Sequence, residues 1–397
     1  MKMLLQRGHM MVLLILVGQF FTAFVGRSLS PFMVYIGDDL ALSKMQLGLF
    51  PTALFIGQFL ATLPIGYYTD RVDTRKLMLV LMSVVAVSFL CFAWMDNFYL
   101  ALFFIVIAGL GYGGIHPVTN KLLVYEFPPS KLTLPMGVKQ MSITLASAGV
   151  SILLLPLAVI IGWRWAVTLA VLILVIVCFI SSVYFSRLPW KEKPVQSTAS
   201  LWKQVKLLIQ SKMLFFTNSS AFILMGVQMT FNTFLILFLV ETKDWTIYVA
   251  GLCLALSELC GAAGRVLWGV ISDRFFAGNR WLVLLVLTLI SSGSLMGLYF
   301  SQSVLLMIVL IACTGFALSG FNGIWMMLAV ESVDRSLSGF ASGYSVTVAS
   351  IGVFLIPPLF GYFIEQGGYA LAGLFVSSLF FLCALLMIYA MWVFKLE

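Results

Sequence analysis

Charge is scarce in this sequence. Only 10% of its 397 residues are Asp, Glu, Lys or Arg, whereas 62% are hydrophobic and the mean hydropathy is +1.08. A soluble domain needs far more charge to cover its surface, so the composition excludes a soluble globular protein. The sequence also lacks a nucleotide-binding loop, a cluster of metal ligands and a catalytic triad. We therefore expect no enzyme and no cofactor, and an energy source that is a gradient of ions or substrate.

Cysteines are few, and no cleavable leader is evident. The six cysteines lie inside apolar runs without the spacing of a metal site, which indicates membrane-buried thiols rather than a disulfide framework. The first apolar run extends from about residue 10 to 36, which is too long for the core of a signal peptide.

Twelve apolar runs are long enough to cross a bilayer, which takes about 20 residues. They cover 10–36, 46–67, 77–95, 99–124, 134–161, 165–187, 213–240, 246–272, 281–300, 304–330, 338–364 and 369–394. The only long polar segment lies between the sixth and seventh runs. The sequence thus predicts an all-α membrane protein with an N-terminal six-helix half at 1–187, a linker at 188–212 and a C-terminal six-helix half at 213–397.

The linker contains an amphipathic stretch. Trp202, Val205, Leu208 and Ile209 share one face of a helix, and Lys203 and Lys206 lie elsewhere on it. This pattern fits a short helix lying on the membrane surface. A solvated linker fits it equally well.

Basic residues predict the orientation. With the N-terminus in the cytoplasm, sixteen of the 23 Lys and Arg residues fall in cytoplasmic segments and three, Lys44, Arg164 and Lys243, on the opposite side. Cytoplasmic loops carry the excess of Lys and Arg, so we expect both termini and the linker inside the cell, in the inner (plasma) membrane. The net charge of +8 is then a topology signal rather than a nucleic-acid patch.

A polar stretch recurs at a fixed distance. The sequence GYYTDRVDTRK joins the second and third runs, and Gly66, Asp70 and Arg71 reappear 203 residues later as Gly269, Asp273 and Arg274. The segments SITLASAG, from Ser142, and SVTVASIG, from Ser345, keep the same offset. Two matches at one offset indicate a duplicated chain.

The first polar stretch resembles the G-x-L-A-D-R-x-G-R-R/K loop of the major facilitator superfamily. The matching residues are Gly66, Asp70, Arg71, Arg75 and Lys76, whereas Asp73 replaces the usual loop glycine. The resemblance implies twelve helices in two pseudo-symmetric six-helix bundles around a site near the midplane. It also implies that this loop and its repeat (Gly269, Asp273, Arg274) gate the cytoplasmic side. Alternatively, the loop charges only fix the topology.

Five charged residues lie within the predicted spans: Arg27, Lys121, Lys139, Arg265 and Glu258. A charge near a helix centre costs roughly 3 kcal/mol on insertion scales and usually faces a cavity. Four cations against one anion favour an anionic substrate. Lys121 and Lys139 could instead extend to the interface, and Arg265 could serve only the gate.

The two arginines narrow the resemblance to particular groups within the superfamily. Arg27, with the SLSPFM that follows, resembles the first helix of the anion:cation symporters, and Arg265-Val-Leu-Trp-Gly269 resembles the eighth helix of monocarboxylate transporters and oxalate/formate exchangers. The first resemblance implies that Arg27 binds a substrate carboxylate, and the second implies that Arg265 contacts the substrate. We therefore expect the two arginines, one from each half, to clamp the anion. Pro31 frees backbone groups near Arg27, which predicts a bend that lines the site.

Other polar residues in the spans complete the candidate site. The predicted substrate contacts, besides the two arginines, are Lys139, Gln140, His116, Asn120, Asn322 and Trp325. Each of them could instead make an interhelical hydrogen bond. Glu258 is the predicted proton carrier, and His116 is its rival.

The sequence favours a secondary transporter that moves a small organic anion, a carboxylate, by alternating access with proton coupling. A drug or metabolite exporter working as a proton antiporter is the alternative; Arg265 would then pair with Glu258 and leave an apolar cavity. A membrane sensor is a third possibility, although it would usually carry an added signalling domain. The expected partners are an anionic small molecule, the lipid bilayer and a proton or other coupling ion, with no nucleic acid and a monomeric chain.

Overall fold

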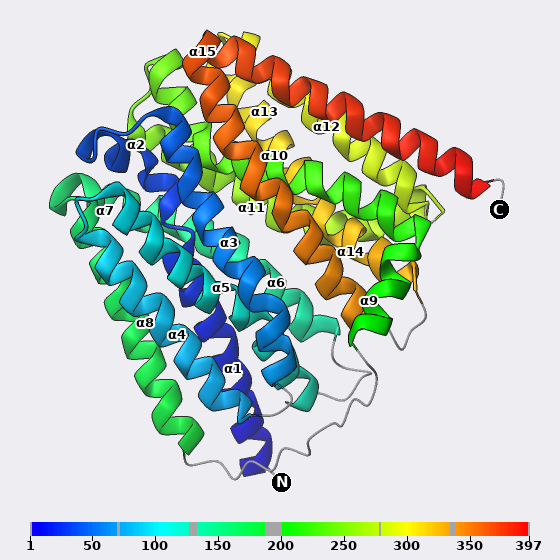
Figure 1. The fold of residues 1–397 in the computed structure, drawn as a ribbon. Helices are drawn as coiled ribbons and strands as arrows, with labels where there is room; N and C mark the ends of the chain where they lie inside the picture. The colour runs from blue at the N-terminus through cyan, green and yellow to red at the C-terminus, as the bar shows by residue number, and fades with distance from the viewer. Residues whose placement is uncertain are drawn as a thin grey trace. The chain divides into compact units, whose positions relative to one another are not determined.

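The structure is a computed structural model, and it describes residues 2–69, 72–126, 133–186, 201–277, 279–333 and 338–395. In these ranges every regular element is a helix (Figure 1). Eleven helical segments are long and apolar enough to cross a membrane. The last of them, Gly343–Phe394, belongs to α15 (Ser338–Lys395), which is not one continuous helix.

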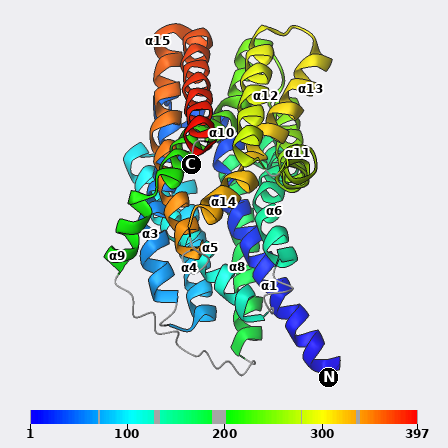
Figure 2. The ribbon, with the colours of Figure 1, turned by 90° about the vertical axis from the view of Figure 1, so that its right-hand side faces the viewer.

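α15 is divided at Gly367 and Gly368. Both have non-helical backbone angles, and Gly368 has φ 69° and ψ −172°, a combination that a side chain would strain. The chain reverses there, so that a first limb and a second limb extend from one turn (Figures 1 and 2). Counting both limbs, the described residues contain twelve crossing segments, and the prediction of a twelve-helix membrane protein is confirmed.

The helices form two compact units. Unit 1 comprises Met1–Leu40 and Ala53–Ser197, and unit 2 comprises Ala41–Thr52 and Thr198–Glu397. The first half of the chain contributes α1 (Lys2–Gly26), α2 (Leu29–Asp39), α3 (Lys44–Thr69), α4 (Thr74–Ala93), α5 (Phe98–Glu126), α6 (Thr133–Gly149), the π-helix η2 (Val150–Leu154), α7 (Leu155–Ile161) and α8 (Trp163–Ser186). The second half contributes α9 (Leu201–Gln210), α10 (Lys212–Lys243), α11 (Ile247–Phe275), α12 (Arg280–Phe300), α13 (Val304–Thr314), the π-helix η3 (Gly315–Ser319), α14 (Phe321–Glu331) and α15.

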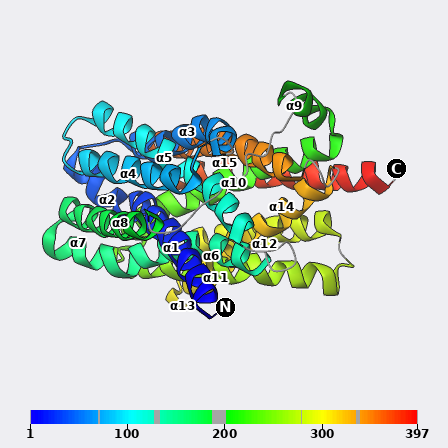
Figure 3. The ribbon, with the colours of Figure 1, turned by 90° about the horizontal axis from the view of Figure 1, so that it is seen from below.

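Glycines let the helices of unit 1 approach closely. A Cβ added at Gly109 of α5 would lie 2.1 Å from the carbonyl oxygen of Leu54 in α3, and one at Gly111 would lie 2.6 Å from that of Leu81 in α4. Seen from below, α4 and α5 run side by side (Figure 3). The run Gly109–Gly113 therefore serves close packing of membrane helices, as the sequence suggests.

The duplicated segments pack in the same way in both units. Gly149, at the end of SITLASAG, faces Phe24 of α1, the first helix of its half. Gly352, at the end of SVTVASIG, faces Phe222 of α10, the first membrane-spanning helix of the other half, and a Cβ there would lie 1.9 Å from the Phe222 carbonyl oxygen. The repeat in the sequence thus corresponds to an equivalent helix contact in each unit.

Ala41–Thr52 belongs to unit 2 through several polar contacts. Lys44 pairs with Glu241 of α10, the Met45 N–H donates to Glu365 at 2.6 Å, and Thr52 Oγ1 donates to the Phe354 carbonyl at 2.9 Å. The backbones also touch, because a Cβ at Gly48 would lie 2.7 Å from the Pro357 carbonyl oxygen.

The end of the linker is helical. α9 places Leu208 against Leu214, Ala329 and Ala341, whereas Ile209 is 61% exposed. Leu208 and Ile209, predicted to share one face, therefore have different surroundings. Whether α9 lies on the membrane surface stays a prediction, as does the orientation of the chain.

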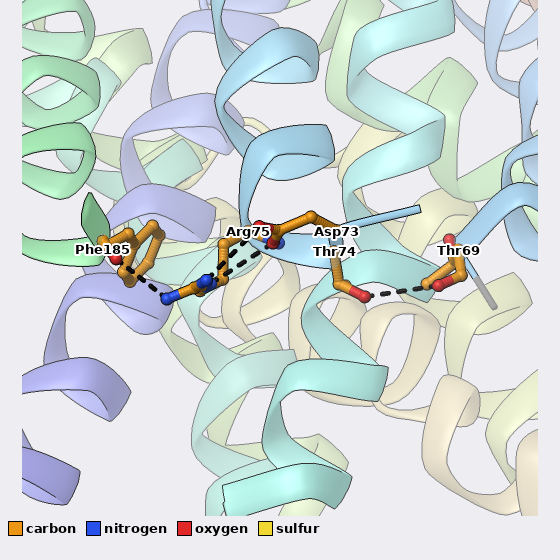
Figure 4. A network of polar contacts seen from close by, with 5 residues as sticks. All are labelled: Thr69, Asp73, Thr74, Arg75 and Phe185. Atoms are coloured by element: carbon orange, nitrogen blue, oxygen red, sulfur yellow. Dashed lines mark hydrogen bonds and ion pairs between the residues drawn. The ribbon is translucent and has the colours of Figure 1, made fainter. Parts of the chain in front are cut away.

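α4 begins at an aspartate cap (Figure 4). Asp73 accepts the backbone N–H of Arg75 at 3.0 Å and two side-chain hydrogen bonds from the same arginine at 3.3 Å. Arg75 also donates to the Phe185 carbonyl of α8 at 2.8 Å, and Thr74 donates to the Thr69 carbonyl at 3.3 Å. The network thus ties the start of α4 to the ends of α3 and α8.

Asp73 gives this network a pH dependence. Burial raises the pKa of Asp73, but the side-chain hydrogen bonds and charge of Arg75, with the backbone N–H groups of Arg75 and Lys76, outweigh it and leave the pKa below its ordinary value. A carboxyl group whose folded pKa is depressed stabilises the fold above its unfolded pKa, and this contribution is lost as the pH falls through the folded pKa.

We expect Asp73→Asn, which keeps the helix cap but loses the ion pair, to destabilise the protein at neutral pH by up to about 1 kcal/mol. The difference from wild type should hold from about pH 7 to about pH 5 and shrink as the pH falls below about 4, the ordinary pKa of an aspartate, toward the lower folded pKa of Asp73. Thermal melting of the purified protein across this range measures it, with Asp244→Asn as the control outside the network. A difference that persists at low pH would contradict the role of the ion pair.

Close packing at Gly109 gives a second prediction. Gly109→Ala places a methyl group against the Leu54 carbonyl and should cost about 1–3 kcal/mol of stability, as overpacking does. The control is Gly293→Ala, since a Cβ at Gly293 meets nothing within 4 Å. Thermal melting in detergent should separate the two variants, and equal melting temperatures would show that α3 and α5 can move apart without cost.

Candidate functional site

Arg27 lies at a break in its membrane helix. α1 ends at Gly26 and α2 begins at Leu29, and the Ser28 N–H bonds to the Val25 carbonyl at 3.2 Å. Pro31 has no N–H, so the Arg27 carbonyl loses its usual helical partner four residues on. The helix is therefore interrupted where Pro31 predicts a bend, and its place in a substrate site stays a prediction. A Cβ at Gly26 would lie 2.6 Å from the Tyr112 ring, which shows how closely this break approaches α5.

The Arg27 guanidinium is half-buried. Its Cζ lies 6.0 Å from the centroid of the Phe55 ring, within the range of a cation–π contact. The aromatic face supports the positive charge without neutralising it.

Lys139 of α6 is buried inside unit 1, with only 1% of its surface exposed. Its Nζ donates to the His116 carbonyl at 3.0 Å and to Oδ1 of Asn120, both on α5. The alternative in which Lys139 extends to the interface is wrong. Both oxygens are neutral, so hydrogen bonds satisfy this ammonium group but do not cancel its charge.

Arg27, His116 and Lys139 form what we call the cationic cluster of unit 1. His116 lies within electrostatic range of both cations, and its ring stands perpendicular to Tyr112 with 5.9 Å between centroids. Acidic side chains that the structure describes in unit 1 occupy helix ends: Asp38, Asp39, Asp73 and Asp96. Four predicted site residues, Arg27, His116, Asn120 and Lys139, thus come together. The side chain of Gln140 lies outside the described residues.

In unit 2 a π-helix organises the polar groups. η3 ends at Ser319, whose carbonyl accepts Nε of Arg265 at 3.3 Å and Nδ2 of Asn322 at 3.0 Å. Gln228 of α10 donates to the Ser319 hydroxyl at 2.8 Å and accepts from Asn322 at 3.1 Å. Ser319 was not among the predicted site residues. The run of small residues around Gly315 and Gly320, dense enough for close packing, is the sequence signal that could have found it.

Glu258 and Trp325 are also buried in unit 2, each 2% exposed. Glu258 accepts Nδ2 of Asn232 at 2.6 Å, a pairing that the sequence did not predict. Trp325 packs against Phe321, and its indole N–H finds no acceptor in the part of the chain that the structure describes. A buried donor of this kind is available to a ligand.

The two predicted gating loops are described in part. Asp70 and Arg71 lie outside the described residues, Lys76 is exposed, and a Cβ at Gly66 or Gly269 would meet nothing within 4 Å. In the second loop Asp273 pairs with Arg280 at 2.6 Å, much as Asp73 pairs with Arg75 in the first. Arg274 is exposed, with its guanidinium 5.9 Å from the Phe275 ring. Lys121 donates to the Thr69 carbonyl beside the first loop.

Comparisons with known proteins agree with this architecture. The family model described as Major Facilitator Superfamily matches residues 15–352 and 219–397. The chain is 25% identical to the "Probable hexose phosphate transport protein" of Chlamydia trachomatis serovar D, over 93% of this chain and 87% of that protein. It is 23% identical to the hexuronate transporter of Bacillus subtilis strain 168, over 84% of this chain and 82% of that protein.

Among solved structures, the fold resembles a bacterial homologue of the human lysosomal transporter Spinster in its inward-facing and occupied conformation. The TM-score is 0.79, with 16% identity over 96% of each chain. A likeness at this identity concerns the fold. Together with the matched family model and the twelve crossing segments, it leads to one conclusion: the chain belongs to the major facilitator superfamily of multi-pass membrane transporters.

Proposed function

We propose that the protein transports a small organic anion, a carboxylate, by alternating access. The observation that carries the proposal is Lys139, a buried ammonium group held by two neutral oxygens and close to His116 and Arg27. A charge in the membrane interior is costly unless a counter-charge offsets it. An anionic substrate supplies that counter-charge each time it binds.

The relatives support an anionic substrate. Hexose phosphates carry a phosphate and hexuronates a carboxylate, and both proteins align with most of this chain. Within the cluster, Arg27 offers a planar fork that meets a carboxylate in two parallel hydrogen bonds. Lys139 adds a point charge with three donors, of which two make the bonds described above.

The remaining parts of the proposal come from the sequence. Arg265, Asn322 and Trp325 of unit 2 stay predicted substrate contacts, and the unsatisfied indole N–H of Trp325 favours its inclusion. Transport is proposed for the inner membrane with both termini in the cytoplasm, and with a proton as the coupling ion.

We expect Arg27→Lys to weaken carboxylate binding by about 1–3 kcal/mol, roughly 5- to 150-fold, because lysine keeps the charge but loses the fork. Lys139→Gln should weaken every anion tested, since it removes the buried charge. Calorimetry on the purified protein with glucuronate and glucose 6-phosphate measures both effects. Glucose and ethidium serve as the neutral and cationic probes, and Lys206→Gln, at an exposed site on α9, as the control variant.

The same titrations decide against the exporter alternative or in its favour. If Arg27→Lys and Lys139→Gln bind the anions like wild type while ethidium binds tightly, the anion proposal fails. Arg265→Lys tests the predicted second arginine of the clamp separately. If Arg265→Lys binds the anions with unchanged affinity, Arg265 is not a substrate contact, and the proposed role of the cationic cluster is unaffected.

Proton coupling gives a distinct prediction. Glu258 is buried and accepts a hydrogen bond from the Asn232 amide. A protonated carboxyl group can accept the same bond through its carbonyl oxygen. We expect Glu258→Gln to keep exchange of substrate across vesicles but to lose accumulation driven by a proton gradient. Asp244→Asn, an isosteric change at an exposed loop position, should retain both. If the Glu258→Gln variant still accumulates substrate, Glu258 is not the proton carrier, and His116→Gln is the next variant to test.

A further inference from the structure

Unit 2 contains a cavity of about 400 Å³ that the transport mechanism does not use. Its lining residues belong to α10, α12 and the two limbs of α15. Its wall consists mainly of aromatic and aliphatic side chains, such as Phe231, Phe234, Phe360 and Phe380. The volume falls within the range of ligand pockets.

The wall of this cavity offers almost nothing to a polar ligand. No charged side chain lines it among the described residues, and its hydroxyl groups belong to Thr230, Ser292, Ser377 and two tyrosines. The Thr230 hydroxyl donates to the Gly226 carbonyl at 2.9 Å, and that of Ser377 donates to the Gly373 carbonyl at 2.8 Å. These two hydroxyls are engaged by their own helices, and that of Tyr369 donates to Glu241 at 2.9 Å, so the surface seen by an occupant is mainly apolar.

The cavity opens sideways toward the surroundings of the helix bundle. Its rim includes Met296 and Phe300 of α12 and Leu374 of the second limb, which are 50%, 69% and 64% exposed. Its inner end is closed by Val227 and Thr230, which are 1% and 2% exposed. Exposed apolar side chains on membrane-spanning helices face lipid, so the opening leads to hydrocarbon.

The length of the cavity matches one leaflet. Along α10 its lining runs from Val227 to Phe238, eleven helical steps of about 1.5 Å, or roughly 16 Å. The hydrocarbon core is about 30 Å thick, so the cavity extends from near one face to about the middle of the membrane. An acyl chain of a phospholipid spans the same depth.

A cation lies at the polar end. Lys243, in the last turn of α10, places Nζ 6.0 Å from the centroid of Phe238 and donates to the carbonyls of Tyr299 and Ser301 at 3.2 and 2.8 Å. An ammonium group has three donors, so one remains for a further acceptor. The nearby carboxylate Glu241 is engaged by Lys44 and by the Tyr369 hydroxyl, and no carboxylate pairs with Lys243 among the described residues.

We propose that this cavity binds one acyl chain of a membrane phospholipid whose anionic headgroup contacts Lys243. The inference does not depend on the proposed function, because every group it uses lies in unit 2 and none belongs to the cationic cluster. The lipid is a bound component of the transporter rather than its cargo.

The test uses the full chain in phosphatidylcholine vesicles that contain phosphatidylglycerol with a photoreactive group on its acyl chain. After irradiation, peptide mapping should place the label within 227–238 of α10 and 373–380 of α15. Gly373→Leu should reduce labelling at least several-fold, because Gly373 lines the cavity and a Cβ there meets nothing within 4 Å. The matched control is Gly293→Leu, at an exposed glycine of α12 where a Cβ likewise meets nothing within 4 Å and which does not line the cavity.

The headgroup is tested by Lys243→Gln. This variant should lose several-fold of its labelling by phosphatidylglycerol while labelling by a matched phosphatidylcholine probe stays unchanged. Label spread evenly over lipid-facing helices, or equal labelling of Gly373→Leu and wild type, would overturn the proposal. So would protection of the cavity by glucuronate, which would make the cavity part of the substrate path. Binding of glucuronate by Gly373→Leu is measured alongside, so that failure of the lipid site and failure of the anion site give different results.

Discussion

The absence of water from the hydrocarbon core is the constraint on which the rest of this structure depends. Each backbone and side-chain polar group within the spans has to find its partner in the chain itself. Many hydroxyl groups of the described residues meet this requirement by donating to a carbonyl four residues earlier, as Thr230 and Ser377 do. Departures from regular helix, at Arg27–Ser28 and at η3, expose backbone oxygens instead, and the Ser319 carbonyl then receives the side chains of Arg265 and Asn322. Two of the predicted site residues thus lie at such interruptions or contact them: Arg27 lies between α1 and α2, and Arg265 donates to the end of η3.

Close packing decides where those interruptions can lie. Gly26 lets the end of α1 meet Tyr112, and Gly264 lets α11 approach Phe316, whose carbonyl oxygen would lie 2.3 Å from an added Cβ. Without these glycines Arg27 would be held away from α5, and Arg265 away from η3. Small residues in membrane helices therefore position charges as well as join helices.

Much of this arrangement could be predicted because hydropathy, charge and repeats are properties of the chain alone. The twelve spans follow from run length, and the bend at Arg27 follows from the missing N–H of Pro31. The partners of a buried side chain could not be predicted in the same way, since they come from other helices. From the sequence, Lys139 could extend to the interface or lie in the interior. In the structure its hydrogen bonds to the oxygens of His116 and Asn120 hold it in the interior. The bond between Asn232 and Glu258 and the role of Ser319 likewise depend on how α10, α11 and η3 pack.

The two cations of unit 1 differ in how firmly they are held. Lys139 lies within a regular helix, is fully enclosed and makes two hydrogen bonds to α5, so its position is set by the packing of α5 and α6. Arg27 lies where α1 gives way to α2, on backbone that has lost a helical hydrogen bond. Residues at the ends of helices absorb changes in backbone angle most readily. An anion that binds both cations would therefore contact one charge of fixed position and one charge that can move. Its binding energy could then change the preferred angle between α1 and α2. In this way the substrate itself can favour one arrangement of the first membrane helix over another.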